Sequence, residues 1–157
     1  MKYIGAVFLF LAGMALHWWW STYFTLWGLA PHLLLILTVA IAANGGPVPG
    51  QCYGFAWGLF LDAAGVHLFG ANALVLTFAA YLVGMARRQM DVSSPLPQSM
   101  VVAAITLAHV LALAGLGLLF EGRTFWAGWA SALFLPLVNA AAAPLLFPLV
   151  RRTVGGL

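Results

Sequence analysis

Long apolar runs, broken only by short stretches of glycine, proline or charge, occupy nearly the whole of this chain. Of its 157 residues, 64% are hydrophobic and only 6% are charged, whereas an ordinary soluble domain is about a quarter charged. Because so few charges cannot cover a water-facing surface, the sequence predicts an integral membrane protein. The runs are continuous and do not alternate in polarity, which favours membrane-spanning helices. We expect an all-α protein with one transmembrane domain over residues 1–157.

Six apolar segments are bounded by turn signals and are predicted to span the membrane. Their approximate ranges are 3–20, 30–44, 50–64, 70–87, 99–120 and 125–150. The stretches 44–51, 65–70 and 89–99 are predicted loops because glycine, proline or polar residues gather there. The second and third segments are shorter than the roughly 20 residues that cross a bilayer. We therefore expect them to pack inside the bundle or against a partner, and a re-entrant hairpin is the alternative to two separate spans.

Basic residues predict the orientation of these spans, because short loops rich in Lys and Arg stay in the cytoplasm. Lys2 precedes the first span, and the pairs Arg87–Arg88 and Arg151–Arg152 end the fourth and sixth. Six spans place all five on one face and leave Arg123 on the other. Both termini are therefore predicted to be cytoplasmic. The net charge of +3 is mostly this topology signal, so we predict no nucleic-acid partner.

Tryptophans follow the first span at Trp18, Trp19 and Trp20. They are predicted to anchor the outer interface of the lipid bilayer, where this residue is enriched. A binding surface for another membrane protein is the alternative. The N-terminal segment also resembles a signal peptide with a cleavage site near residues 12–15, but its apolar run continues into the tryptophans. We expect it to remain as an uncleaved first span.

Glycines recur every four residues at Gly50, Gly54 and Gly58, and Asp62 is the next step of this series. Residues four apart share one face of a helix, and small residues there let two helix backbones approach closely. The stripe predicts tight packing, either against another span of this chain or against a partner protein.

A carboxylate in an apolar segment costs free energy and is by default a candidate functional residue. Three roles are open for Asp62. It could accept hydrogen bonds from the following turn or cap the next helix near Gly70 and Asn72. It could pair with Arg123 or with a basic residue of a partner. It could also take part in a proton or ion relay, although His109 is the only other titratable group predicted at mid-membrane.

Patterns typical of catalysis or metal binding do not occur. No zinc-protease, nucleophile-elbow or phosphate-loop motif occurs, and the chain has three acidic residues. None of the histidines His17, His32, His67 and His109 has zinc-ligand spacing with another candidate ligand. One cysteine, Cys52, allows no intramolecular disulfide. We expect a non-enzyme without a metal or cofactor.

The segment from 31 to 91 resembles the MreD family of the bacterial rod-shape system. The family pattern is a proline-led short helix, a Gly/Pro turn, a helix of the form GxxxGLxxD, a loop into GxxAL, and a helix ending in basic residues. The matching residues are Pro31, Gly54, Gly58, Leu59, Asp62, Gly70, Ala73, Leu74, Arg87 and Arg88. His32 stands where members often have aspartate.

The resemblance implies a non-catalytic scaffold in the bacterial inner membrane that acts with MreC, a bitopic protein with a periplasmic domain. It further implies association with the glycosyltransferase and transpeptidase of lateral peptidoglycan synthesis, guided by MreB filaments. In this interpretation Asp62 and the glycine stripe shape a surface that holds the single-pass partner. The family fold is similar to the six-helix substrate-binding subunits of energy-coupling-factor transporters, so a vitamin-binding subunit is the alternative function.

Overall fold

The computed structural model describes residues 2–23, 30–65, 68–89, 92–124 and 128–154. Across these residues the chain is helical, which confirms the predicted all-α class. The six helices in chain order are α1 (Lys2–Tyr23), α2 (Leu33–Gly45), α3 (Pro47–Ala64), α4 (Ala71–Ala86), α5 (Pro95–Glu121) and α6 (Trp129–Val154). Each coincides with one predicted span.

Two loops are shorter than predicted. Helix α3 begins at Pro47 instead of residue 50, and α5 begins at Pro95 instead of residue 99. In both helices a proline occupies the first turn. The fixed φ of proline suits that position, and its missing N–H would have had no helical partner there. The predicted loops 44–51 and 89–99 were therefore too long at their C-terminal ends.

The last two helices form a long apolar hairpin. Residues 95–121 of α5 and 131–153 of α6 are each long and apolar enough to cross a membrane. Helix α6 starts four residues later than predicted and extends through Arg151 and Arg152. It remains one helix although it contains Pro136, Pro144 and Pro148.

Helix α2 lies at the centre of the bundle and contacts all five other helices. Every residue from Leu33 to Ala43 is buried. A helix that is apolar on all sides belongs in an interior, and α2 is covered by protein along its length. This explains how a helix of 13 residues fits in the bundle although it is too short to span lipid by itself.

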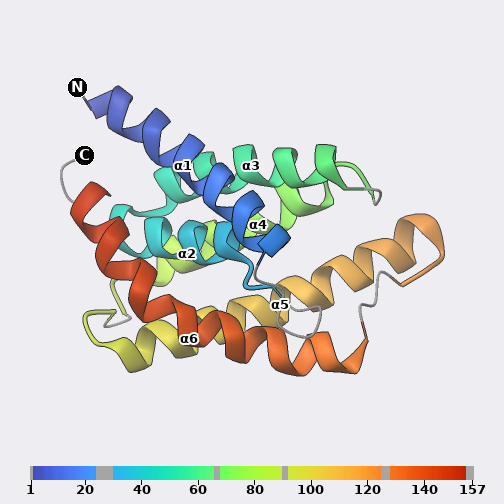
Figure 1. Ribbon diagram of the computed structural model, residues 1–157. Helices are drawn as coiled ribbons and strands as arrows, with labels where there is room; N and C mark the ends of the chain where they lie inside the picture. The colour runs from blue at the N-terminus through green and yellow to red at the C-terminus, as the bar shows by residue number, and fades with distance from the viewer. Residues whose placement is uncertain (1, 24–29, 66–67, 90–91, 125–127, 155–157) are drawn as a thin grey trace.

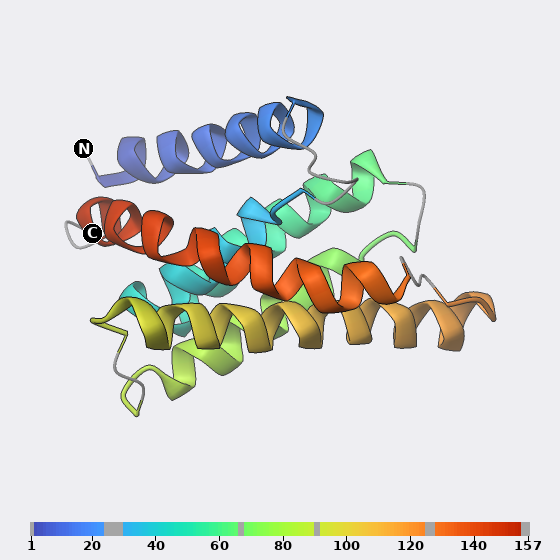
Figure 2. The ribbon, with the colours of Figure 1, turned by 60° about the horizontal axis from the view of Figure 1, so that its bottom comes forward.

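The other helices surround α2 in two groups. Helices α3 and α4 pack closely against each other, as do α5 and α6, and Figure 2 shows α5 and α6 running side by side. Helix α1 lies across α2 and α3. It is held there by Phe10, whose ring stacks on Trp57 with centroids 5.9 Å apart, and the Trp57 indole N–H donates to the Phe10 carbonyl at 3.2 Å.

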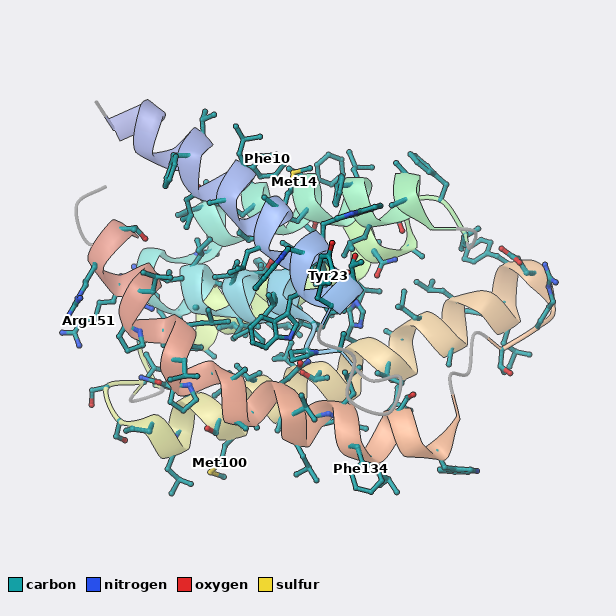
Figure 3. The ribbon with its side chains drawn as sticks, viewed as in Figure 1. Phe10, Met14, Tyr23, Met100, Phe134 and Arg151 are labelled. Atoms are coloured by element: carbon teal, nitrogen blue, oxygen red, sulfur yellow. The ribbon has the colours of Figure 1, made fainter. Side chains whose placement is uncertain are left out.

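The surface of the bundle is apolar. Large side chains such as Met100 and Phe134 project away from the helices (Figure 3). Such a surface suits lipid contact rather than water.

The two chain ends lie at the same end of the bundle (Figure 1). The connections α2–α3 and α4–α5 also lie there, and Arg151 projects from that end in Figure 3. The connections α3–α4 and α5–α6 lie at the opposite end.

Candidate functional site

Asp62 caps the helix that follows it. Its carboxylate is buried, with 6% of the residue exposed. Oδ1 accepts hydrogen bonds from the backbone N–H and the side-chain amide of Asn72, both at 3.0 Å, and Oδ2 accepts from the Ala73 N–H at 3.0 Å. The first N–H groups of a helix lack helical partners, and negative charge is favourable beside them. The hydrogen bonds are those of the first of the three roles considered for this residue.

The other proposed partner of Asp62 is engaged elsewhere. Arg123 pairs with Glu121 at 3.1 Å, at the exposed end of α5. It is the one ion pair in the described part of the chain. The Asp62–Arg123 pair, which was one of the three alternatives, therefore does not form in this structure.

The glycine stripe packs inside the protein. A Cβ atom added at Gly50 would lie 2.9 Å from Ala42 Cα, and one at Gly58 would lie 2.3 Å from Ala73 Cα. At Gly54 it would lie 3.0 Å from the Leu76 carbonyl oxygen. All three glycines are buried, and they contact α2 and α4. Of the two kinds of tight packing predicted for this stripe, the structure shows the one within the chain.

Gly58 and Asp62 act on the same turn of α4. Gly58 lies against the backbone of Asn72 and Ala73, and Asp62, one helical turn further on, binds the N–H groups of those two residues. Without a side chain at Gly58, α4 approaches closely enough for its N–H groups to reach a carboxylate on α3. We call this arrangement of Gly54, Gly58, Asp62, Asn72 and Ala73 the α3–α4 clamp.

A reciprocal contact occurs at the other end of the same helix pair. A Cβ atom at Gly84 of α4 would lie 2.4 Å from Pro47 Cα in the first turn of α3. Gly84 was not among the predicted site residues. The sequence offered one signal for it, since Gly84 lies near the C-terminus of α4 just as Gly50 lies near the N-terminus of α3. Gly84 was missed because it has no partner glycine at helical spacing.

Three histidines that are far apart in sequence meet where three helices pack together. His17 of α1 and His109 of α5 both lie against His32, which caps α2, with ring centroids 5.4 and 5.1 Å apart. These three histidines have no ligand spacing in the sequence, and it is the packing of α1, α2 and α5 that brings them together. His67 lies outside the described residues. In the part of the chain that is described, no group of three candidate ligands could hold a metal ion.

Asn139 of α6 completes this polar cluster. Its Oδ1 accepts from the His32 backbone N–H at 2.8 Å, and its amide donates to Thr106 Oγ1 at 3.0 Å. His32 Nδ1 accepts from the Leu35 N–H at 3.2 Å. By contrast, His17 Nδ1 and His109 Nε2 are buried without a hydrogen-bond partner among the described residues.

The predicted membrane anchors divide into outward-facing and inward-facing side chains. Trp18 and Trp19 are exposed, whereas Trp20 packs against the buried core. Arg88, Arg151 and Arg152 are exposed. The predicted role of these residues as membrane anchors requires such exposure.

Arg87 differs from the other basic residues because its side chain lies against the α2–α3 turn. Its Nη1 atom would be 2.8 Å from a Cβ at Gly46. Gly46 has a φ of 101°, a left-handed conformation that glycine adopts readily. The turn thus needs a glycine both for its backbone and for the space that Arg87 occupies.

Comparison with known proteins gives one family. The family model described as rod shape-determining protein MreD matches residues 2–153. No curated protein matches the chain, and no solved structure does. The match extends well beyond the segment 31–91 on which the sequence resemblance rests. Because it covers nearly the whole chain, this chain belongs to the MreD family of membrane proteins, which have a role in rod-shape determination.

Proposed function

We propose that this protein is a non-enzymatic scaffold of the bacterial elongation complex. It spans the inner membrane six times, binds MreC, and supports lateral peptidoglycan synthesis. The observation that carries the proposal is the family match over residues 2–153. Association with the elongation glycosyltransferase and transpeptidase, and with MreB filaments, belongs to the same proposal.

The arrangement of the chain ends supports six spans with both termini in the cytoplasm. Lys2, Arg87 and Arg151 all belong to segments that end on the same side of the bundle. Glu121 and Arg123 belong to the connection at the opposite end. This distribution agrees with the rule that basic residues stay on the cytoplasmic side.

The α3–α4 clamp supports the scaffold proposal because it fixes α3 and α4 against each other. Since its glycines are buried between the chain's own helices, it holds the lipid-facing surface in shape without touching a partner itself. A single-pass partner would contact the exposed side chains of the surrounding helices by close packing, as membrane helices do.

Native mass spectrometry of the chain gently extracted from its own host tests the scaffold. We expect a stoichiometric complex with a single-pass protein that carries a periplasmic domain. Asp62→Ala should weaken that complex and disturb cell shape, whereas Glu121→Gln, which removes the half-buried carboxylate at the end of α5, should not. A chain that purifies without any such protein under these conditions, and cells of normal shape when it is depleted, would reject the proposal.

The polar cluster favours one second candidate, a ligand-binding subunit of the energy-coupling-factor type. His17 and His109 each present a buried nitrogen that has no hydrogen-bond partner among the described residues, and small-molecule sites combine apolar walls with a few such polar groups. A bound small molecule of fixed mass, lost in His109→Phe and present without a protein partner, would favour this function over the scaffold.

A further inference from the structure

The seam between α4 and α5 contains two apolar hollows. The first, of about 200 Å³, lies between Leu82, Val83 and Ala86 of α4 and Val101, Ala104 and Ile105 of α5. The second, of about 440 Å³, lies further along the same seam. Its walls include Leu74, Val75 and Phe78 of α4 and Ala112, Gly115 and Leu116 of α5.

The length of this seam matches one leaflet of a bilayer. From Ala86 to Val75, α4 rises about 16 Å at 1.5 Å per residue. Half of the hydrocarbon thickness is about 15 Å. An acyl chain that enters beside Ala86 therefore reaches the second hollow near the bilayer midplane. The small side chains of Ala104, Ala112 and Gly115 leave room for it.

Among the described residues, net positive charge lies at one end of the seam, because the arginine at the other end is paired with a glutamate. Arg87 and Arg88 directly follow Ala86, which lines the first hollow. Arg88 is exposed, and Arg87 lies over the neighbouring turn at Gly46. The ion pair within the described residues is the one between Arg123 and Glu121, at the far end of α5. Helix α5 also begins here, without a side-chain cap on its N-terminus, and its positive end adds to the same field.

We propose that the α4–α5 seam binds an anionic phospholipid, with its phosphate at Arg88 and Arg87 and an acyl chain in the two hollows. The charge and the apolar hollows together select this occupant. A zwitterionic lipid would fill the hollows equally well but would gain little from the arginines. Basic sites between membrane helices recognise anionic headgroups in this way. The inference requires only that the protein lies in a membrane, and it does not depend on the scaffold proposed above.

Native mass spectrometry of the purified full chain tests this inference. The chain in detergent is titrated with phosphatidylglycerol and, separately, with phosphatidylcholine of the same acyl chains. We expect one phosphatidylglycerol to be retained preferentially. Arg88→Gln removes an exposed charge and should weaken its binding about fivefold. Arg152→Gln, an exposed arginine at the end of α6, is the matched control and should leave binding unchanged.

A second variant tests the acyl-chain site separately from the charge. A Cβ atom at Gly115 would meet nothing within 4 Å, and Gly115 lines the larger hollow, so Gly115→Leu places a side chain where the acyl chain would lie. We expect it to lower the retention of both lipids while the thermal unfolding midpoint stays the same or rises. Equal retention of the two lipids by the parent chain would overturn the proposal. So would an equal loss in Arg152→Gln, or unchanged binding in Gly115→Leu.

Discussion

A single carboxylate in an apolar helix is explained here by three hydrogen bonds. Asp62 holds the Asn72 N–H, the Asn72 amide and the Ala73 N–H. Because all three donors lie at a buried helix start, the charge stays within the fold and is balanced locally by the positive end of α4. An N-cap residue usually precedes the helix whose first turn it binds. Asp62 instead lies on α3 and binds the first turn of α4, so it joins two helices.

Asp62→Ala should therefore lower the thermal unfolding midpoint of the detergent-solubilised protein. It leaves the buried Ala73 N–H and the half-buried Asn72 N–H without their acceptor, which costs up to about 1–3 kcal/mol for each unsatisfied group. Asp62→Asn keeps one acceptor oxygen but turns an amide toward the other donor, so its midpoint should fall between those of Ala and the parent chain. Glu121→Gln is the control for loss of a carboxylate. An Asp62→Ala protein as stable as this control would contradict the capping role.

Sequence could identify Asp62 and its glycine stripe because both follow from local spacing, four residues apart on one helix. It could not identify the polar cluster. The histidines of that cluster come from positions 17, 32 and 109 and its asparagine from 139. Only the packing of α1, α5 and α6 around the start of α2 brings them together. No periodicity in one segment contains that information.

Asn139 gives the polar cluster a measurable role in stability. It is fully buried and joins the start of α2 to Thr106 of α5. Asn139→Ala leaves the His32 N–H without its acceptor, so the thermal midpoint should fall as expected for a cost of about 1–3 kcal/mol. Asn44→Ala is the control, because that side chain bonds only to a carbonyl of its own helix at Ala40. Similar midpoints for the two variants would count against the link.

At the scale of the helix, the distance between α3 and α4 depends on the absence of one methyl group. In Gly58→Ala the new Cβ atom would lie 2.3 Å from Ala73 Cα, so the two backbones must separate and the hydrogen bonds to Asp62 must lengthen. In Gly115→Ala the same change meets nothing within 4 Å, and alanine favours a helix over glycine by about 1 kcal/mol. The midpoint should fall in the first variant and rise or stay constant in the second.

This pair of variants separates packing from helix propensity, because propensity alone predicts that both substitutions stabilise the protein. Thermal unfolding of both proteins in one detergent is the measurement. A gain of stability in Gly58→Ala would show that α3 and α4 do not approach as closely as the structure has them.

Helix boundaries show where sequence reasoning fell short at this scale. The apolar runs located every described helix, and the shortness of the second run correctly suggested that α2 is covered by protein. The same expectation for the third run holds only in part, because α3 has 18 residues and leaves Val48 and Phe55 exposed. The prolines at 47 and 95 were assigned to loops, although each begins a helix. A proline ends a helix when it lies in the interior and starts one at the first turn. Composition alone does not distinguish these two positions.

At the scale of the whole molecule, the sequence predicted a single bundle from the number of apolar runs. It predicted the distribution of charge from the positions of the arginines. Both can be read directly along the chain. Which helix packs against which cannot be read along the chain in this way. Helix α2 lies at the centre because it is apolar on all sides, while α1 crosses the outside. This arrangement becomes visible only when the helices are placed together. The contact of Arg87 with the α2–α3 turn is of the same kind.

The contact between Arg87 and Gly46 leads to a test of the six-span topology. If Arg87 is cytoplasmic, the α2–α3 turn must reach the same face, and α2 and α3 are two spans rather than a hairpin that stays near the outer face. In a Cys52→Ser background, single cysteines at Val48, Gln89 and Thr124 report on the α2–α3, α4–α5 and α5–α6 connections, and all three positions are exposed. A membrane-impermeant maleimide should label Thr124→Cys in intact spheroplasts, and Val48→Cys and Gln89→Cys only after permeabilisation. Labelling of Val48→Cys together with Thr124→Cys would instead place the turn on the outer side and leave α2 and α3 as a re-entrant hairpin.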